Sequence, residues 1–143
     1  MQNNNMNSKD PVSTIMSATV VVAHQFHNFT EVLELFSKHG MHHLPIVDGK
    51  NHLIGIISSN DFLKVFSDVK YNGVKIDPEE LDKAVNITDL MTAHVVTVAP
   101  TATIEQAAEL FAEHKFQAMP VVKDNEIVGI LSSKDVMRLI AYF

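Results

Sequence analysis

Apolar residues along the chain fall into short runs and helical spacings that follow a fixed order. A β-branched run at residues 20–22 comes first, and two further apolar runs follow at 44–47 and 53–57. Runs this short are typical of strands. Between the first and second runs, residues 32–36 have the apolar spacing of a helix that faces a core. A last helix is predicted at 60–66, so the order is strand, helix, strand, strand and helix.

This order is present twice. The segment LPIV at 44–47 returns as MPVV at 119–122, and GIISSND at 55–61 returns as GILSSKD at 129–135. The copies are 75 residues apart at their start and 74 at their end, so one residue is lost near the first hairpin. A period this constant indicates one structural unit that has been duplicated. The elements predicted for the second copy lie at 95–98, 103–111, 119–122, 127–131 and 134–141.

Capping patterns mark where the first helix of each copy begins. Asn28 with Glu31, and Thr103 with Gln106, have the spacing of a capping box, in which each side chain accepts from the other residue's backbone N–H. Hairpin turns are predicted at 48–51 and 123–126, which contain Asp and Asn.

The segment between the copies is predicted to be a connector. It contains a turn at Tyr71-Asn72-Gly73 and a short helix capped by Asp77, with Pro78 at its first position. The charged run at 77–83 is interpreted as a solvated helix face. The polar start of the chain is interpreted as a disordered leader. The predicted organisation is one domain made of a leader, a first repeat, a linker and a second repeat, at residues 1–9, 10–66, 67–86 and 87–143.

Composition narrows the class of protein. Of 143 residues, 46% are hydrophobic and 20% charged, as in an ordinary soluble globular domain. The sequence lacks the roughly 18 continuous apolar residues of a membrane helix and the apolar core of a signal peptide. It has no cysteine, which favours a cytoplasmic location. A net charge of −6 argues against general nucleic-acid binding, which needs a basic surface. We therefore expect a soluble cytoplasmic protein that binds neither membranes nor nucleic acid.

The two copies resemble a pair of cystathionine β-synthase (CBS) domains. The likeness rests on the hydrophobic-Pro-hydrophobic-Val segment before each hairpin and on the Gly-to-Asp segment at the last strand–helix junction, and it extends from about Pro11 to Tyr142. It implies a mixed α/β (α+β) fold of two βαββα repeats packed about a pseudo-twofold axis, with two clefts for adenosine-containing ligands. CBS pairs usually regulate an attached or partner protein and are not enzymes themselves. Because the sequence carries no other domain, it resembles the stand-alone version.

Two Ser-x-x-Asp segments are the strongest candidates for ligand contacts. Ser58 with Asp61, and Ser132 with Asp135, lie where a strand passes into a helix, and the backbone N–H groups of a helix N-terminus favour anions and polar ligands. The resemblance implies that the Asp accepts hydrogen bonds from both ribose hydroxyls, and that the Ser contacts ribose or phosphate. The alternative is a plain helix cap, because Ser-x-x-Asp is itself a capping pattern.

The resemblance also implies that each cleft takes residues from both copies. The segment before one copy's central strand supplies a basic residue to phosphate held with the other copy's Asp. His42 and His43 have this place in the first copy, whereas the second copy has Gln117. The Asp135 cleft is therefore expected to bind phosphate more tightly. The predicted ligand-binding residues are Ser132, Asp135, Lys134, Val96, Phe116, His42 and His43 for the Asp135 cleft, and Ser58, Asp61, Val21, Met41 and Gln117 for the Asp61 cleft.

Some of these residues have a second interpretation. Met41 and Phe116 are either apolar neighbours of an adenine ring or simple core residues. Val21 and Val96 are candidates for backbone contacts to the edge of the base.

Eight histidines raise the question of a metal site. His24 and His27 are closely spaced, as are His39, His42 and His43, but a firm site needs three or four converging ligands with a second shell. His39 and His114 are explained by a helix C-terminus, which favours positive charge. We predict no metal site and no required cofactor.

The leading hypothesis is a regulatory module that senses an adenine nucleotide or related adenosyl ligand. AMP and ADP are favoured, with ATP and S-adenosylmethionine as further candidates. The ligand would bridge both copies and shift their packing. The alternative hypothesis is a structural module that dimerises and binds a partner, with empty clefts. An enzyme is not predicted, because the sequence has neither a catalytic order of Ser, His and Asp nor a phosphate loop.

A homodimer and an unidentified regulated protein are the expected partners. CBS pairs commonly associate through the repeat helices, and these helices have more apolar residues than one small sheet pair would cover. The apolar residues in question are Phe36, Phe62, Phe66, Leu110, Phe111, Met137 and Leu139.

Overall fold

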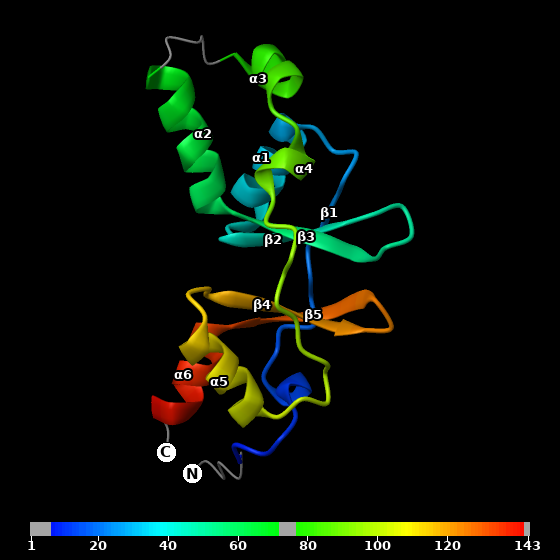
Figure 1. Cartoon of the computed structure of the whole chain (residues 1–143), viewed down its shortest axis with the longest axis vertical. Coiled ribbons are helices and arrows are strands. Elements are labelled where there is room, and N and C mark those ends of the chain that lie inside the picture. Colours follow the sequence, from blue (N-terminus) through cyan, green and yellow to red (C-terminus); the bar gives the residue numbers. More distant parts are fainter. Residues whose placement is uncertain (1–6, 72–76, 142–143) are drawn as a thin grey trace. The chain divides into compact units, whose positions relative to one another are not determined.

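The computed structural model of the chain describes residues 7–71 and 77–141 and contains two compact units (Figure 1). We call Val21–Val95 the first-repeat unit, and Met1–Val20 together with Val96–Phe143 the second-repeat unit. Each unit therefore combines most of one sequence repeat with the first residues of the other repeat.

The first-repeat unit is a three-stranded sheet with its helices on one side (Figure 1). Strand β1 (Ala23–His24) pairs in parallel with β2 (His43–Val47), and β2 pairs antiparallel with β3 (Leu53–Ser58). Helix α1 (Phe29–His39) connects β1 to β2, and α2 (Ser59–Tyr71) follows β3 directly. Two shorter helices, α3 (Pro78–Ala84) and α4 (Ile87–Leu90), complete the unit.

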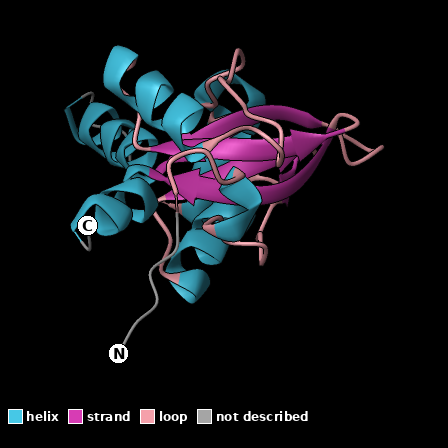
Figure 2. Ribbon diagram, turned by 90° about the horizontal axis from the view of Figure 1, so that it is seen from below, coloured by secondary structure: helices cyan, strands magenta, loops and turns pink. Residues whose placement is uncertain are grey.

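The second-repeat unit has the order helix, strand, strand and helix, as the first-repeat unit has from α1 to α2. Figure 2 shows the helices of the chain in cyan and its strands in magenta. Strands β4 (Ala118–Lys123) and β5 (Glu126–Ser132) form an antiparallel hairpin. Helix α5 (Ile104–Glu113) precedes the hairpin and α6 (Ser133–Ala141) follows it. The N-terminal segment adds a 3-10 helix, η1 (Val12–Thr14). The predicted α+β fold of two repeats is confirmed.

The first predicted strand of each copy is wrong in extent, since residues 20–22 form no strand and 95–98 form a single bridge, at Val98. Val98 donates to the Pro120 carbonyl at 3.2 Å and accepts from Val122 N–H at 2.9 Å. Two residues earlier, the Val96 carbonyl would need the N–H of Pro120 as its donor, and proline has no N–H. Pro45 has the same place in the first-repeat unit. The prolines therefore end the parallel pairing that the β-branched runs predict.

Each unit has its own apolar core. In the first-repeat unit, the Phe62 ring lies 4.8 Å from the Phe29 ring and 5.0 Å from the Phe36 ring, measured between centroids. In the second-repeat unit, Met119 and Leu131 are fully buried among their neighbours. Of the seven residues predicted for a dimer surface, two are buried in these cores and four are partly buried against them, because the helices turn apolar faces to their own sheets. The predicted dimer surface stays a prediction. Phe36, Phe62, Phe66, Leu110, Phe111 and Leu139 are buried in or packed against a core, whereas Met137 is exposed.

Both units are completed by an exchanged segment. Ser17 exchanges two backbone hydrogen bonds of 2.9 Å with Ile130 of β5. Thr92 does the same with Ile56 of β3, at 2.9 and 3.0 Å. Each segment carries a methionine that packs on a strand glycine, Met16 on Gly129 and Met91 on Gly55. The first residues of each repeat thus form an edge of the unit that contains most of the other repeat.

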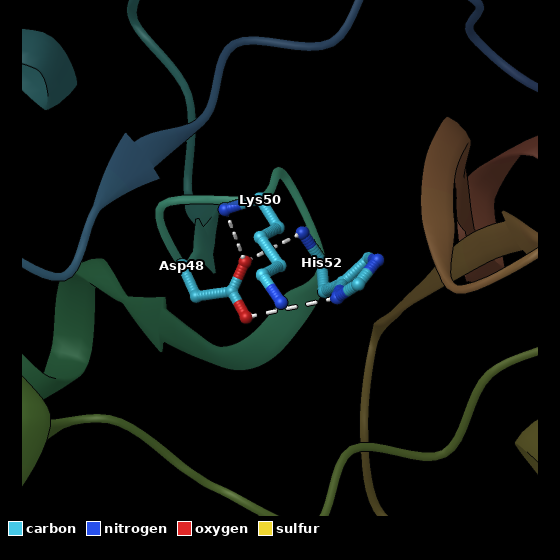
Figure 3. Close-up of polar contacts among 3 residues, drawn as sticks. All are labelled: Asp48, Lys50 and His52. Carbon is cyan, nitrogen blue, oxygen red and sulfur yellow. Dashed lines mark hydrogen bonds and ion pairs between the residues drawn. The ribbon is translucent and has the colours of Figure 1, made fainter.

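The predicted capping boxes and both predicted hairpin turns are confirmed. Both capping boxes are present, and the Asn28 and Thr103 side chains accept from the backbone N–H three residues on. In the first hairpin turn, Asp48 Oδ1 accepts from the backbone N–H of Lys50 at 2.8 Å and of His52 at 2.9 Å (Figure 3). These hydrogen bonds, that from His52 above all, lower the pKa of Asp48 below its ordinary value.

Part of the linker between the repeats packs against the first-repeat unit. The α2 helix extends to Tyr71, past the predicted end at residue 66, and the remainder of the predicted turn at 71–73 lies outside the described residues. The charged run at 77–83 is more than the solvated face that was predicted, because Leu81 is buried. Asp82 also accepts from the backbone N–H and the hydroxyl of Thr30, each at 2.8 Å. A linker carboxylate therefore caps the N-terminus of α1, where negative charge is favourable.

Replacing Asp82 by alanine is expected to lower the free energy of unfolding by about 1–2 kcal/mol, because the α1 N-terminus loses a capping carboxylate. Glu80→Ala is the matched control, since it removes the same charge from an exposed position of α3. Urea denaturation of both variants measures the difference. Equal effects of the two substitutions would contradict the docking role of Asp82.

The N-terminal segment also contributes to a helix start. Residues 1–6 of the predicted leader lie outside the described residues. Ser8 O accepts from Glu105 N–H at 2.8 Å and Asp10 O accepts from Ile104 N–H at 2.9 Å, at the first turn of α5. The last residues of the predicted leader thus belong to the folded second-repeat unit. Over the described residues, the helices are too short or too polar to cross a membrane.

Candidate functional site

Ser58 and Asp61 lie at the junction of β3 and α2. Asp61 Oδ2 accepts from Ser58 N–H at 2.7 Å, and Asp61 N–H donates to Ser58 Oγ at 3.3 Å. The pair caps α2 reciprocally, so the predicted alternative of a helix cap is present. The cap occupies one carboxylate oxygen, and among the described residues Asp61 Oδ1 has neither a hydrogen bond nor an ion pair. Because a carboxylate has about four acceptor positions, capping leaves room for ligand hydroxyls.

Ser132 and Asp135 have the same geometry at the junction of β5 and α6. Asp135 Oδ2 accepts from Ser132 N–H at 2.8 Å, and Asp135 N–H donates to Ser132 Oγ at 3.2 Å. Here the second oxygen has a neighbour, because Arg138 Nη1 lies 3.7 Å from Asp135 Oδ1. Arg138 was not among the predicted site residues. Its position three residues after Asp135 on a predicted helix was the signal that could have found it.

The segments before β2 and β4 are held beside the starts of these helices. His42 O accepts from Ser59 N–H at 2.9 Å, and Gln117 O accepts from Ser133 N–H at 2.9 Å. His42 and Gln117 are therefore structurally equivalent, as the alignment of the repeats predicts. Their predicted contribution to the cleft of the other copy stays a prediction.

His43 lies in the same unit as Asp61. It pairs with Ser58 across β2 and β3. Burial lowers the pKa of His43 below the ordinary value of 6.5, His42 lowers it further, and the negative charge of Asp61 raises it. Since this pKa is lower than in the unfolded chain, folding stability falls as the pH drops from about 6.5 through the lowered pKa. At neutral pH His43 is an uncharged donor or acceptor, and its charge becomes available to a phosphate only in more acidic solution.

Met41 and Phe116 are both partly buried against the core of their own unit. The Phe116 ring stacks on His114 at 5.3 Å and meets Phe111 edge-on at 5.5 Å. Core packing therefore accounts for at least part of the surface of each side chain. Lys134 is exposed at the start of α6.

The backbones of Val21 and Val96 lie just before the shortened first strands. The register that joins Val98 to Val121 gives the Val96 carbonyl no donor on β4, because the residue at that place is Pro120. Ala23 pairs with Ile46 in the same register, so the Val21 carbonyl likewise lies opposite Pro45 and has no donor on β2. The prolines thus leave backbone acceptors at the positions that the sequence assigns to the base edge.

The closely spaced histidines have local explanations. His27 Nδ1 accepts from His24 N–H at 2.9 Å. His39 lies in the last turn of α1, and His114 is the C-cap of α5. In the part of the chain that the structure describes, His, Asp and Glu side chains form no group of three that could hold a metal ion.

Comparison with known proteins gives one consistent result. The family model for the CBS domain matches residues 12–68 and 87–142. Homoserine O-acetyltransferase of Methanohalobium evestigatum is 30% identical over 141 residues, which are 98% of this chain and 26% of that protein. The chain spans between 20% and 43% of the length of the first curated relatives that it matches.

Two similar solved structures contain adenosyl compounds. CBSX2 in complex with AMP has a TM-score of 0.75 and 26% identity, covering 93% of this chain and 97% of that chain. The CBS domain pair of protein MJ0100, in complex with 5′-methylthioadenosine and S-adenosyl-L-methionine, has a TM-score of 0.76 and 28% identity, covering 92% and 96%. With two in-register matches over most of its length, this chain belongs to the CBS domain family.

Proposed function

We propose that this chain is a regulatory module that binds an adenosine-containing ligand, with AMP or ADP preferred. The observation that carries the proposal is the repeated Asp carboxylate at the start of α2 and α6. In both units one oxygen caps the helix, which fixes the carboxylate in place and leaves its other oxygen for ribose hydroxyls. Similar CBS pairs have been solved with AMP and with S-adenosyl-L-methionine, which support this class of ligand.

The preference for adenine follows from the backbone of Val21 and Val96. A carbonyl without a donor on the neighbouring strand can accept from the amino group of adenine. Guanine presents a carbonyl oxygen at that position, which would meet the backbone carbonyl without a proton between them. A site of this kind rejects the wrong base because its polar group is left unpaired.

The proposed role of the ligand is regulatory and not catalytic. A ligand that binds one arrangement of the module better than another shifts the population between them by its difference in affinity. An attached or partner protein would respond to that shift. The enzyme names among the relatives belong to proteins more than twice the length of this chain, so their activities do not transfer to it.

AMP and ADP are expected to raise the melting temperature of the protein, and GMP is expected to raise it less. A ligand that binds only the folded state adds RT ln(1 + [L]/Kd), or about 2.7 kcal/mol at a hundredfold excess over Kd. GMP is the matched control because it carries the same ribose and phosphate. The absence of a shift with any adenosyl ligand at millimolar concentration would favour the alternative, a structural module that binds a partner with empty clefts.

We also propose a homodimer that uses the final helices of the repeats. Leu63 on α2 and Met137 on α6 are equivalent residues, and their side chains are 62% and 54% exposed. Exposed apolar residues at equivalent positions of both helices favour association with a second copy. Sedimentation at micromolar concentration is expected to show a dimer, and Leu63→Glu with Met137→Glu is expected to give monomer. Lys123→Glu, at the exposed end of β4, is the control, and a monomeric parent protein would contradict the proposal.

A further inference from the structure

The two oxygens of the Asp135 carboxylate face two different donors, a backbone N–H and a guanidinium. Oδ2 accepts from Ser132 N–H at 2.8 Å, and Oδ1 faces the Arg138 guanidinium at 3.7 Å. The Asp135 side chain is 20% exposed, whereas that of Arg138 is 72% exposed. The carboxylate is thus fixed by the helix start, while the guanidinium reaches it from solvent and can turn without disturbing the core.

We infer that Arg138 is a specificity-determining residue of the Asp135 site, and that it selects adenosyl ligands with a phosphate over those with an uncharged or cationic group in its place. The inference rests on the proposed function. Without a nearby cation, the negative Asp135 would repel the phosphate of any nucleotide whose ribose it binds. A guanidinium offsets this repulsion, and its several N–H donors match phosphate oxygens in geometry.

The same cation acts against other members of the ligand class. The sulfonium of S-adenosylmethionine carries a positive charge where AMP carries its phosphate, so Arg138 would repel it. Adenosine has no charge there, so its affinity is not expected to depend on Arg138. Arg138 therefore sorts three ligands that share one nucleoside by the charge at a single position.

The first-repeat unit provides an internal comparison. Lys64 stands three residues after Asp61, as Arg138 does after Asp135. Within the described residues, Lys64 forms no ion pair with Asp61. A lysine ammonium is a compact, strongly hydrated point charge and lacks the planar fork of arginine. The discrimination is therefore assigned to the Asp135 site.

Calorimetry at pH 7.5 with AMP, adenosine and S-adenosylmethionine tests the inference. The Asp61→Asn background isolates the Asp135 site, because the amide oxygen can still accept from Ser58 N–H. In this background, Arg138→Gln is expected to weaken AMP about tenfold. The affinity for adenosine should change by less than about twofold, and the affinity for S-adenosylmethionine should not fall. Lys64→Gln is the matched control and is expected to change none of the three affinities.

The outcomes separate the inference from the function on which it rests. An equal loss for all three ligands would assign Arg138 a structural role and overturn the inference, as would unchanged AMP affinity. An Arg138→Lys variant that keeps part of the AMP preference would support it. If the parent protein binds none of the three ligands, the proposed function itself fails, and the inference fails with it.

Discussion

Replacing Asp135 by alanine is expected to weaken AMP binding more than tenfold, and more than replacing Asp61 does. Both carboxylates have the same cap, with Oδ2 at 2.8 and 2.7 Å from a serine N–H. The surroundings differ, because the Asp135 junction has Lys134 and Arg138 on its helix. Asn60 and Lys64 stand at the equivalent places beside Asp61. One lost charge-assisted hydrogen bond costs about 1.5–3 kcal/mol, which is more than tenfold in affinity.

Calorimetry with AMP on the two alanine variants measures this difference. Both substitutions also remove a helix cap, so circular dichroism must first show that each variant is folded at the temperature used. Asp135→Asn and Asp61→Asn serve as controls, because an amide oxygen can still accept from the serine N–H while the charge is gone. Equal losses of affinity, or a larger loss for Asp61→Ala, would show that the two sites have been assigned in the wrong order.

Local signals in the sequence predicted much of the fold. The capping boxes at Asn28 and Thr103 and the turn at Asp48 depend on residues three or four positions apart, so their chemistry is visible in a short stretch of sequence. The duplication strengthened each signal, because weak motifs that recur together at one constant offset indicate a repeated structural unit. The Ser-x-x-Asp junctions were found in this way, and the two roles considered for them use different oxygens of the same carboxylate.

Signals between distant residues were not visible. The contact of Asp82 with Thr30 joins positions 52 residues apart, and a charged run on a short helix reads as a solvated surface until its partner is known. The shortened first strands have a different cause. A β-branched run predicts strand from side-chain preference alone, whereas Pro45 and Pro120 act on it from the neighbouring strand. Only the strand register shows that each proline lies opposite a β-branched run.

The exchange of segments between the units has one strong consequence for stability. Gly55 of β3 lies directly under the Met91 side chain. A Cβ at this position would overlap Met91 Sδ and lie 2.8 Å from Met91 Cγ and 3.0 Å from the Thr92 carbonyl oxygen. Thr92 is held there by its two hydrogen bonds with Ile56, so the backbone oxygen cannot withdraw without breaking them. The residue must therefore be glycine for reasons of space.

Gly55→Ala is expected to lower the free energy of unfolding by about 3 kcal/mol, as overpacking against fixed backbone does. Gly49→Ala is the matched control, because its new Cβ would meet only Phe26 Cε2, at 4.0 Å, and is expected to change stability by less than about 0.5 kcal/mol. The effect of Gly129→Ala on stability should fall between the two, since the three atoms nearest its Cβ belong to the flexible Met16 side chain. A double-mutant cycle with Met91→Ala measured by urea denaturation identifies the cause. If the clash with Met91 carries the effect, Gly55→Ala loses much of its penalty in the Met91→Ala background. Strict additivity of the two substitutions would show that the Met91 side chain does not carry the penalty, and would assign it to the Thr92 carbonyl oxygen.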